Sequence, residues 1–334
     1  MNWGIIGLGH MAKNFANSIK ELEESNLLGI SSNSLFKLIK FGYKYKIKYK
    51  YLFKDYDKIL LCKDIDNIYI GTLNNSHYDL INKCIDAKKN ILCEKPFVTN
   101  FTQAQELKKK FSSSNVFFLE GIAYRSHPQT EHIIDLLKNN HIGKVLRIES
   151  TFGFNAGNLK KNGRLLNKKL GGGSILDLGC YPVSMSNLIA NINNEKEIVP
   201  KLSEVKGKIG KTGVDIFGKA KLSYSNGISS EIKVSIEENL KNETIIFGAN
   251  GKIKILNPWL PNKNSIIEIH KNEVIKKLHT SSNFGIFAYQ IETFNKLIKE
   301  KKFKNVYPAM SIDNSINCMK VMMKWKDLIQ TNDK

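Results

Sequence analysis

The stretch Gly4-Ile-Ile-Gly-Leu-Gly-His-Met-Ala12 decides the fold of this 334-residue chain. It lies between a short apolar run and a segment whose apolar residues repeat at helical spacing. Gly7 permits a tight turn, Gly9 lets the backbone approach a ligand, and Ala12 lets the helix pack closely against the strand. Such a turn places backbone amides at a helix N-terminus, where they can bind the pyrophosphate of a dinucleotide. We therefore expect cofactor contacts in this turn from Gly7, Gly9, His10 and Met11.

Around this turn, apolar runs typical of strands alternate with amphipathic runs typical of helices. The strand-like runs are residues 3–6, 27–31, 65–72, 90–94 and 116–120. The helix-like runs are 11–24, 35–41, 78–88 and 102–111, whereas 59–62 fits either a strand or the end of a helix. This alternation predicts a doubly wound parallel sheet of Rossmann type, with helices on both faces. We assign residues 1–121 to this dinucleotide-binding domain.

The pattern changes after residue 121. Helices are expected over 128–139, up to about 192, and over 287–301 and 312–329, with a Gly- and Lys-rich loop over 156–173. A long strand is expected over 145–154 and consecutive strands over about 205–278, with hairpin turns at Asn226-Gly227 and Asn250-Gly251. Residues 122–334 are therefore predicted to form an α+β domain with a largely antiparallel, open-faced sheet, which binds substrate and joins subunits.

Composition narrows the class of protein. The chain is 42% hydrophobic and 25% charged, which is ordinary for a globular protein. No apolar run approaches the roughly 20 residues of a membrane span, and no targeting peptide precedes the first strand, so we expect no membrane partner. The five cysteines are odd in number and contain no C-x-x-C pair, which favours reduced thiols in the cytoplasm.

The net charge of +20 raises the possibility of a nucleic-acid partner. However, only Arg125, Arg147 and Arg164 are arginines, the residue best suited to bidentate phosphate recognition, and the lysines are spread along the chain. The densest basic run, residues 37–54 with interleaved tyrosines, fits either a phosphate-binding surface or a solvated helix face. We favour the solvated face and expect no specific nucleic-acid partner.

The end of the second predicted strand bears on the choice of cofactor. NAD-specific sites usually carry Asp or Glu there to bind the ribose 2′-hydroxyl. Here Ser31-Ser32-Asn33-Ser34 is followed by Lys37, with no carboxylate. Hydroxyls, an amide and an ammonium group suit a 2′-phosphate. NADP is therefore favoured, NAD is the alternative, and the expected contacts are Ser32, Asn33 and Lys37.

Two further motifs carry residues suited to proton transfer. Cys93-Glu94-Lys95-Pro96 ends a predicted parallel strand, where ligands bind, although a surface lysine is the plainer interpretation of Lys95. In Gly171-Gly-Gly-Ser-Ile-Leu-Asp177-Leu-Gly-Cys-Tyr181-Pro182, Asp177 and Tyr181 share one face if the segment is helical. Tyr181 fits a general acid/base, or equally a structural tyrosine beside a capping aspartate. No His/Cys cluster has metal-ligand spacing, so no metal is expected.

The motifs G-x-G-x-x-A, E-K-P, Y-R-x-H-P-Q and G-G-G-x-x-x-D-x-G-x-Y follow one another in an order that resembles the Gfo/Idh/MocA oxidoreductases. The resemblance is strongest over residues 1–190, and Tyr124–Gln129 and Gly179–Pro182 are similar to the NADP-dependent dihydrodiol and D-xylose dehydrogenase branch. It implies catalytic roles for Lys95, Tyr181 and Asp177. It also implies cofactor contacts from Thr72, Asn74, His77, Glu94 and Lys95. The implied substrate contacts are Arg125, Asp177, Tyr181 and Arg164. The branch often carries arginine where this chain has Asn33.

The resulting hypothesis is an NAD(P)-dependent oxidoreductase that transfers a hydride to or from a secondary hydroxyl or carbonyl carbon of a sugar, cyclic polyol or diol. Tyr181 would act as acid/base and Lys95 would assist it. The expected assembly is a homodimer or homotetramer. One alternative is a regulator on the same fold that binds nucleotide and sugar without turnover. The other is a nucleic-acid-associated protein that uses its basic surface.

Overall fold

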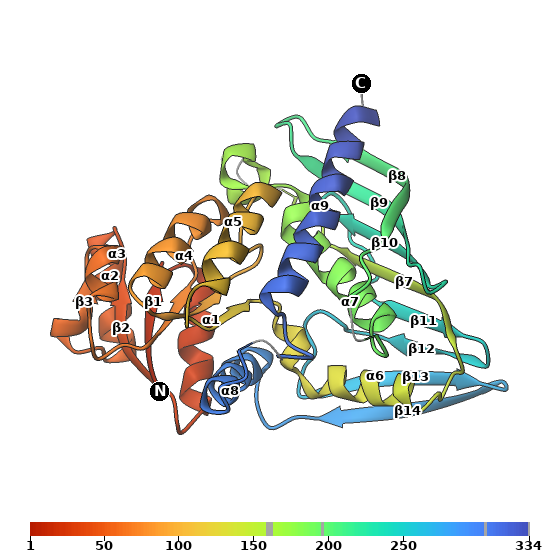
Figure 1. Cartoon of the computed structure of the whole chain (residues 1–334), viewed down its shortest axis with the longest axis horizontal. Helices are drawn as coiled ribbons and strands as arrows, with labels where there is room; N and C mark the ends of the chain where they lie inside the picture. Colours follow the sequence, from red (N-terminus) through yellow and green to blue (C-terminus); the bar gives the residue numbers. More distant parts are fainter. Residues whose placement is uncertain (158–162, 195–196, 304–305, 333–334) are drawn as a thin grey trace. The chain divides into compact units, whose positions relative to one another are not determined.

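The computed structural model describes residues 1–157, 163–194, 197–303 and 306–332. The chain forms two compact units (Figure 1). The N-terminal unit contains Met1–Ala123 and Phe284–Ser315, and the C-terminal unit contains Tyr124–Asn283 and Ile316–Lys334. Residues 158–162, which belong to the loop expected over 156–173, lie outside the described residues.

The N-terminal unit is built on a six-stranded sheet in the order β3-β2-β1-β4-β5-β6. The strands are β1 (Asn2–Ile6), β2 (Asn26–Ser31), β3 (Leu52–Phe53), β4 (Asn67–Ile70), β5 (Asn90–Cys93) and β6 (Phe118–Glu120). All neighbouring pairs are parallel, so the predicted doubly wound sheet is confirmed. The strand order reverses between β1 and β4, and ligands of such sheets bind outside the carboxyl ends of the strands at that point.

Helices connect these strands. They are α1 (His10–Ser18), α2 (Leu35–Tyr45), α3 (Tyr56–Leu60), α4 (His77–Asp86) and α5 (Phe101–Ser112). Helix α8 (Ile286–Lys299) belongs to the same unit but follows β14 in the chain. The ambiguous run 59–62 lies at the end of α3, and the helix expected over 11–24 is shorter, because a 3₁₀ turn at Ile19–Glu21 follows α1. The predicted alternation is thus confirmed, with shifted element ends.

An aromatic cluster joins distant segments in the core of the N-terminal unit. Trp3 of β1 lies with its ring centroid 4.6 Å from that of Phe294 of α8, and Phe117 lies 4.9 Å from Phe294. Phe15 of α1 stacks on Tyr69 of β4 at 4.1 Å. Helix α8 therefore completes this core although it follows almost the whole C-terminal unit in sequence. The division at residues 121 and 122 as a functional boundary stays a prediction.

The C-terminal unit is built on an eight-stranded sheet in the order β14-β13-β12-β11-β7-β10-β9-β8. Its strands are β7 (Val145–Gly153), β8 (Lys201–Ile209), β9 (Asp215–Ser223), β10 (Ser229–Ser235), β11 (Thr244–Gly248), β12 (Gly251–Ile255), β13 (Asn264–Lys271) and β14 (Val274–Ser281). Only the β7–β10 pair is parallel, which confirms the largely antiparallel sheet. The predicted Asn-Gly turns join β9 to β10 and β11 to β12.

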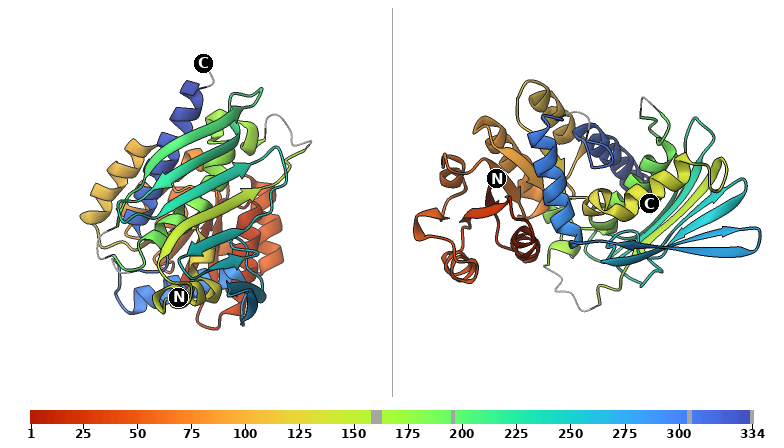
Figure 2. Two further views of the ribbon diagram at one scale, coloured as in Figure 1. Left: turned by 90° about the vertical axis from the view of Figure 1, so that its right-hand side faces the viewer. Right: turned by 90° about the horizontal axis from the view of Figure 1, so that it is seen from below.

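Helices pack on one face of this sheet, and Figure 2 (left) looks onto the opposite face. They are α6 (Pro128–Lys138), α7 (Cys180–Ala190) and α9 (Ile312–Asn332), whose first four residues belong to the N-terminal unit. A π-helical turn, Ile175–Gly179, leads directly into α7. No helix among the described residues combines the length and apolar character that crossing a bilayer requires.

Candidate active site

The glycine turn after β1 is shaped by a close approach of two backbones. Gly7 has φ +89°, and a Cβ there would lie 2.6 Å from Thr72 Cγ2 and 2.9 Å from the Gly71 carbonyl oxygen. A side chain at Gly9 would meet only the Gly71 oxygen, at 3.7 Å. Gly9 caps α1 without a side-chain bond, and the first turn of α1 has no acid, so its amides can face an anion. These features fit the pyrophosphate of a dinucleotide.

The segment after β2 is polar and lacks negative charge. The Ser32 side chain is buried, and its hydroxyl accepts from the Ser34 amide at 3.2 Å. The Ser34 hydroxyl caps α2 by accepting from the Lys37 amide. The side chains of Asn33 and Lys37 point outward and are exposed. The local fold thus uses Ser32 internally and leaves Asn33 and Lys37 as the groups best placed to meet a phosphate.

Lys95 follows β5 between two residues that are anchored by buried side chains. Tyr69 donates from its hydroxyl to Glu94 Oε1 at 2.6 Å, and Glu94 is 8% exposed. His77 is fully buried at the start of α4, and its Nδ1 lies 2.9 Å from the Pro96 carbonyl oxygen. Glu94 and His77 therefore hold the backbone on either side of Lys95, and their direct contact with cofactor stays a prediction.

The connection after β4 carries the other two predicted nicotinamide contacts. The Thr72 hydroxyl accepts from the Ser76 hydroxyl at 2.7 Å, and Asn74 is buried in the turn before α4. This turn lies at the same carboxyl edge as the glycine turn, because the Gly71 amide donates to the Ile6 carbonyl oxygen at 2.9 Å. The structure thus gathers the predicted cofactor residues of the N-terminal unit along one sheet edge.

Glu120 is a buried acid at this edge that the sequence analysis did not single out. It ends β6 opposite Cys93 of β5 and is 2% exposed. The Phe97 amide donates to its Oε1 at 3.1 Å. Burial raises the pKa of Glu120 from 4.5 to about 7, and the hydrogen bond from the Phe97 amide and the more distant charge of Lys95 partly offset this rise. Its position at a strand end next to the E-K-P strand was the available signal.

In the C-terminal unit, Asp177 lies on the π-helical turn before α7. Its Oδ1 accepts from Arg164 Nη2 at 2.9 Å, and the side chains of Asp177 and Arg164 are 8% and 37% exposed. The helical winding of this segment begins at Ile175, so Asp177 and Tyr181 both lie in helical structure. Pro182 has no amide hydrogen for an i−4 bond, which favours a wider turn before it.

Asp215, which the sequence analysis missed, anchors that turn. Its Oδ2 accepts from the Ser174 hydroxyl at 2.9 Å and from the Ile175 amide at 2.7 Å. Gly173 has φ +114°, and a Cβ there would lie 2.5 Å from Asp215 Oδ1. Asp215 is 1% exposed, and burial raises its pKa. The triple glycine therefore lets a buried carboxylate reach the start of the segment that carries Asp177 and Tyr181.

Tyr181 belongs to an aromatic cluster. Its ring centroid lies 5.1 Å from that of Phe152 at an interplanar angle of 86°, and 6.0 Å from that of Trp259. Tyr124 lies 6.3 Å away, is completely buried, and shares a 2.8 Å hydrogen bond with the Ser184 hydroxyl. Burial raises the pKa of Tyr124 to about 12, so Tyr124 is poorly suited to proton transfer. Tyr181 is the half-buried tyrosine of the pair.

The Y-R-x-H-P-Q segment supports α7. Arg125 is 3% exposed, and its Nη1 donates to the Ser184 carbonyl oxygen at 3.1 Å. His127 is buried and caps α6, and burial lowers its pKa to about 4, so its imidazole is neutral near pH 7. Arg125 thus fixes the helix that carries Tyr181, and a direct contact with substrate stays a prediction.

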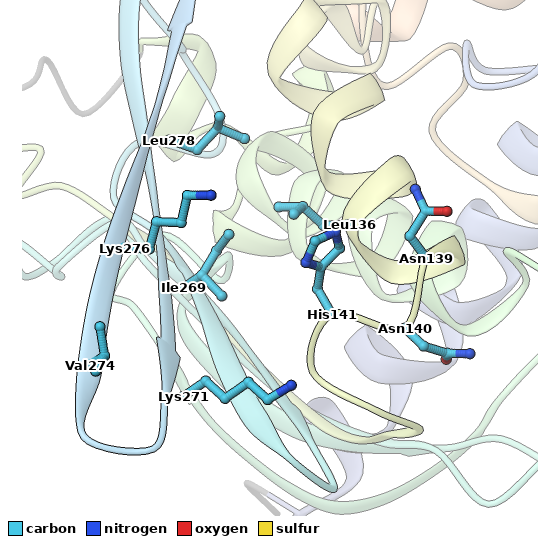
Figure 3. Close-up of a pocket in the computed structure, with 9 residues that line it drawn as sticks. All are labelled: Leu136, Asn139, Asn140, His141, Ile269, Lys271, Val274, Lys276 and Leu278. Carbon is cyan, nitrogen blue, oxygen red and sulfur yellow. The ribbon is translucent and has the colours of Figure 1, made fainter.

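A cavity of about 410 Å³ lies elsewhere in the C-terminal unit, between α6 and the β13–β14 hairpin (Figure 3). Its lining residues are Leu136, Asn139, Asn140, His141, Ile269, Lys271, Val274, Lys276 and Leu278. None of the predicted site residues lines it. Among the described residues, no group of three or more His, Cys, Asp or Glu side chains is arranged to hold a metal ion.

Comparisons with known proteins agree with this frame. Residues 1–122 match the model of an oxidoreductase family with an NAD-binding Rossmann fold, and residues 130–254 match the GFO/IDH/MocA C-terminal domain. The chain is 32% identical to a trans-1,2-dihydrobenzene-1,2-diol dehydrogenase of Xenopus tropicalis, over 94% of this chain and 93% of that protein. The human enzyme of that name is 25% identical, over 85% and 83% of the two chains.

Solved structures share the fold. An aldose-aldose oxidoreductase from Caulobacter crescentus aligns with a TM-score of 0.87 at 20% identity, over 99% of this chain and 98% of that one. A 3-ketoreductase from Actinomadura kijaniata aligns with a TM-score of 0.86 at 18% identity, over 99% and 97%. The fold and the site edge define an oxidoreductase that uses NADP or NAD. The chain belongs to the Gfo/Idh/MocA family, which confirms the resemblance inferred from its motifs.

Replacing Glu120 tests whether the pKa of this buried acid is raised in the folded protein. Because its pKa is raised, the folded protein keeps a proton that the unfolded chain releases near pH 4.5, so wild-type stability falls as pH rises from about 4.5 to 7. Glu120→Gln should match wild type at pH 4.5 and exceed it by about 3 kcal/mol at pH 8. Urea unfolding at both pH values measures this difference, and equal stability at pH 8 would contradict it.

Replacing Asp215 tests the anchor of the turn. Asp215→Ala leaves the Ser174 hydroxyl and Ile175 amide buried without their acceptor, which should cost about 2 to 4 kcal/mol. Turnover should fall more than KM rises, because the turn that precedes Tyr181 and carries Asp177 is displaced. Asp64→Ala removes a hydrogen bond from Tyr51 in the N-terminal unit and serves as the control. The control variant should keep wild-type turnover. If Asp215→Ala also kept it, Asp215 would not position the site.

Proposed function

We propose that the chain catalyses reversible oxidation of a secondary hydroxyl group on a cyclic diol, polyol or sugar, with NADP as the preferred cofactor. The bound nicotinamide supplies or accepts the hydride. The observation that carries the proposal is the half-buried Tyr181 at the start of α7, directly after a turn that the buried Asp215 and the adjacent glycines hold in place. A tyrosine held rigidly at one position can exchange a proton with a bound hydroxyl group.

In this mechanism, Tyr181 takes the hydroxyl proton during oxidation and returns a proton during reduction. Lys95, whose backbone is anchored through Glu94 and His77, stabilises the negative charge that develops on the alkoxide and the phenolate. Asp177 accepts a hydrogen bond from a second substrate hydroxyl, and its ion pair with Arg164 fixes the carboxylate orientation. Thr72 and Asn74 contact the cofactor along the β1–β4 edge.

The aromatic cluster around Tyr181 favours a substrate that has a flat or apolar ring. Phe152 and Tyr181 are both half-buried, with their rings in edge-to-face contact, and the buried Trp259 stacks behind Phe152 at 5.8 Å. An apolar ring gains free energy against such a wall, whereas a linear polyol does not. The relatives named as dihydrodiol dehydrogenases act on a ring diol by their name. We therefore rank cyclic diols first and aldoses second.

The proposal also includes a preference for NADP, a cytoplasmic location and a homo-oligomeric assembly. The segment 31–37 lacks an acid to bind a ribose 2′-hydroxyl, and the exposed Asn33 and Lys37 favour a 2′-phosphate, so NADP is preferred to NAD. All five cysteines are thiols, which supports the cytoplasm. The sheet face seen in Figure 2 (left) offers a surface for a homodimer or homotetramer.

Tyr181→Phe tests the acid/base role. Loss of the hydroxyl should lower kcat by about 10²- to 10⁴-fold while the Kd for NADP stays unchanged. The assay is reduced-cofactor absorbance with a panel of cyclic diols, inositols and aldoses, and Lys95→Ala should lower kcat in the same way. Tyr224→Phe is the matched control, because its buried hydroxyl bonds to Asn187 on the same helix α7.

Two results would contradict this assignment. Near-full turnover of Tyr181→Phe on a good substrate would remove the acid/base from the mechanism. NADP binding by the wild-type chain without turnover on any substrate of the panel would favour the alternative of a nucleotide- and sugar-sensing regulator.

Asn33→Asp tests the cofactor preference. A carboxylate at this exposed position repels a 2′-phosphate and can bind a 2′-hydroxyl, so KM for NADP should rise about tenfold or more while KM for NAD falls. Steady-state kinetics with both cofactors gives the ratio. A wild-type enzyme with equal kcat/KM for the two cofactors, unaltered by Asn33→Asp, would overturn the preference.

A further inference from the structure

The segment around α2 concentrates positive charge without compensation. Residues 25–54 contain no Asp or Glu, and they contain seven lysines: Lys37, Lys40, Lys44, Lys46, Lys48, Lys50 and Lys54. None of these seven forms an ion pair within the described chain, whereas lysines of both units elsewhere pair with acids, as in Lys83–Asp57 and Lys219–Glu231. The charge of this segment is therefore directed to solvent.

Helix α2 is apolar on two faces. Its inner face is buried in the N-terminal unit through Leu38, Phe41 and Tyr45. Its outer face carries Phe36, Ile39 and Tyr43, which are 74%, 55% and 89% exposed. Their spacing of three and four residues makes them one continuous stripe. A second apolar stripe is not needed to pack this helix against the sheet.

The exposed apolar side chains are concentrated here. Leu35 at the start of α2 is 47% exposed, and Tyr49 in the turn after α2 is 89% exposed. Lysines border the stripe, and Lys40 Nζ lies 5.7 Å from the Phe36 ring centroid. Lysine stems can lie along apolar surface while their ammonium groups reach anionic groups at its rim. We call Leu35, Phe36, Ile39, Tyr43 and Tyr49, with Lys40, Lys44, Lys46 and Lys48, the α2 surface.

We propose that the α2 surface binds the face of a phospholipid bilayer that carries anionic headgroups. An amphipathic helix with lysines beside exposed aromatic and aliphatic side chains lies in the interface, with its apolar stripe among the upper acyl chains. Four to eight basic residues on such a helix match an anionic leaflet by charge. Helix α2 would lie on the bilayer rather than span it, so no transmembrane helix is required.

A bilayer fits the α2 surface better than a nucleic acid does. Tyrosine and phenylalanine rings could stack on bases, but the aliphatic Leu35 and Ile39 have no such role and gain free energy by insertion among lipids. The segment also has no arginine, the residue preferred for phosphate and base contacts. The sequence alone predicted a solvated face here and no membrane partner, because it did not reveal that Phe36, Ile39 and Tyr43 form an exposed apolar stripe beside the lysines.

The proposal does not depend on the proposed function, and its test needs no substrate. The full-length protein is sedimented with large vesicles of phosphatidylcholine, alone or containing 30 mol% phosphatidylserine, about the anionic content of a cytoplasmic leaflet. Binding is expected only with phosphatidylserine, and it should weaken as salt rises from 0.05 to about 0.5 M, because the Debye length shortens.

Variants locate the binding surface. Lys44→Gln/Lys46→Gln/Lys48→Gln should lower the vesicle partition coefficient on the order of 100-fold, since each lysine contributes about fivefold near an anionic surface. Ile39→Ser/Tyr43→Ser should lower it about tenfold or more without a change in net charge. The matched control is Lys201→Gln/Lys206→Gln/Lys211→Gln, three exposed lysines of the C-terminal unit, which should bind as wild type does. Circular dichroism confirms that each variant is folded.

Three results would overturn the proposal. The first is absence of binding to phosphatidylserine vesicles at low salt. The second is an equal loss in the control triple variant, which would make the binding a property of net charge alone. The third is salt-sensitive binding to single-stranded RNA, lost in Ile39→Ser/Tyr43→Ser, with none to vesicles, which would assign the α2 surface to nucleic acid. NADP binding should be unchanged in all variants, because Lys37 is left intact.

Discussion

The N-terminal unit depends on one steric constraint, the contact between the Gly7 turn and the backbone at Gly71. With Thr72 Cγ2 only 2.6 Å from where a Cβ would lie, no side chain fits at Gly7. This contact joins the ends of β1 and β4, the two strands between which the strand order reverses. All predicted cofactor contacts before residue 96 therefore follow strands that end at this edge, because parallel strands share one carboxyl edge.

In the C-terminal unit, a buried acid, Asp215, fixes the turn that precedes helix α7. A π-helical turn has poorly arranged backbone donors at its start, and Asp215 accepts from two groups there. Burial of a carboxylate costs free energy unless such donors surround it. A side chain at position 173 would overlap with Asp215, so glycine there lets the carboxylate reach its two donors. Asp215 thus fixes the turn that precedes Tyr181. Arg125 and Tyr124 fix α7 one turn after Tyr181, through their bonds to Ser184.

Local patterns in the sequence predicted the elements and both sheets, because glycine turns, Asn-Gly pairs and apolar periodicity act over a few residues. They did not predict that α8 returns to the N-terminal core, since the contact of Phe294 with Trp3 has no local signal. Asp215 was missed for the same reason, being about 40 residues from its partners. The motifs indicated which residues to examine, but not that Arg125 would be buried against α7.

The arginines and the lysines of this chain differ in how they are used. Each of the three arginines has a defined local partner: Arg125 bonds to Ser184, Arg147 pairs with Glu149, and Arg164 pairs with Asp177. Some lysines, such as Lys83 and Lys219, pair with acids, but these pairs contribute nothing to the net charge of +20, which is the excess of 51 basic over 31 acidic residues. Seven lysines of this excess lie between residues 37 and 54 with no acid among them, and this group coincides with the apolar stripe of α2.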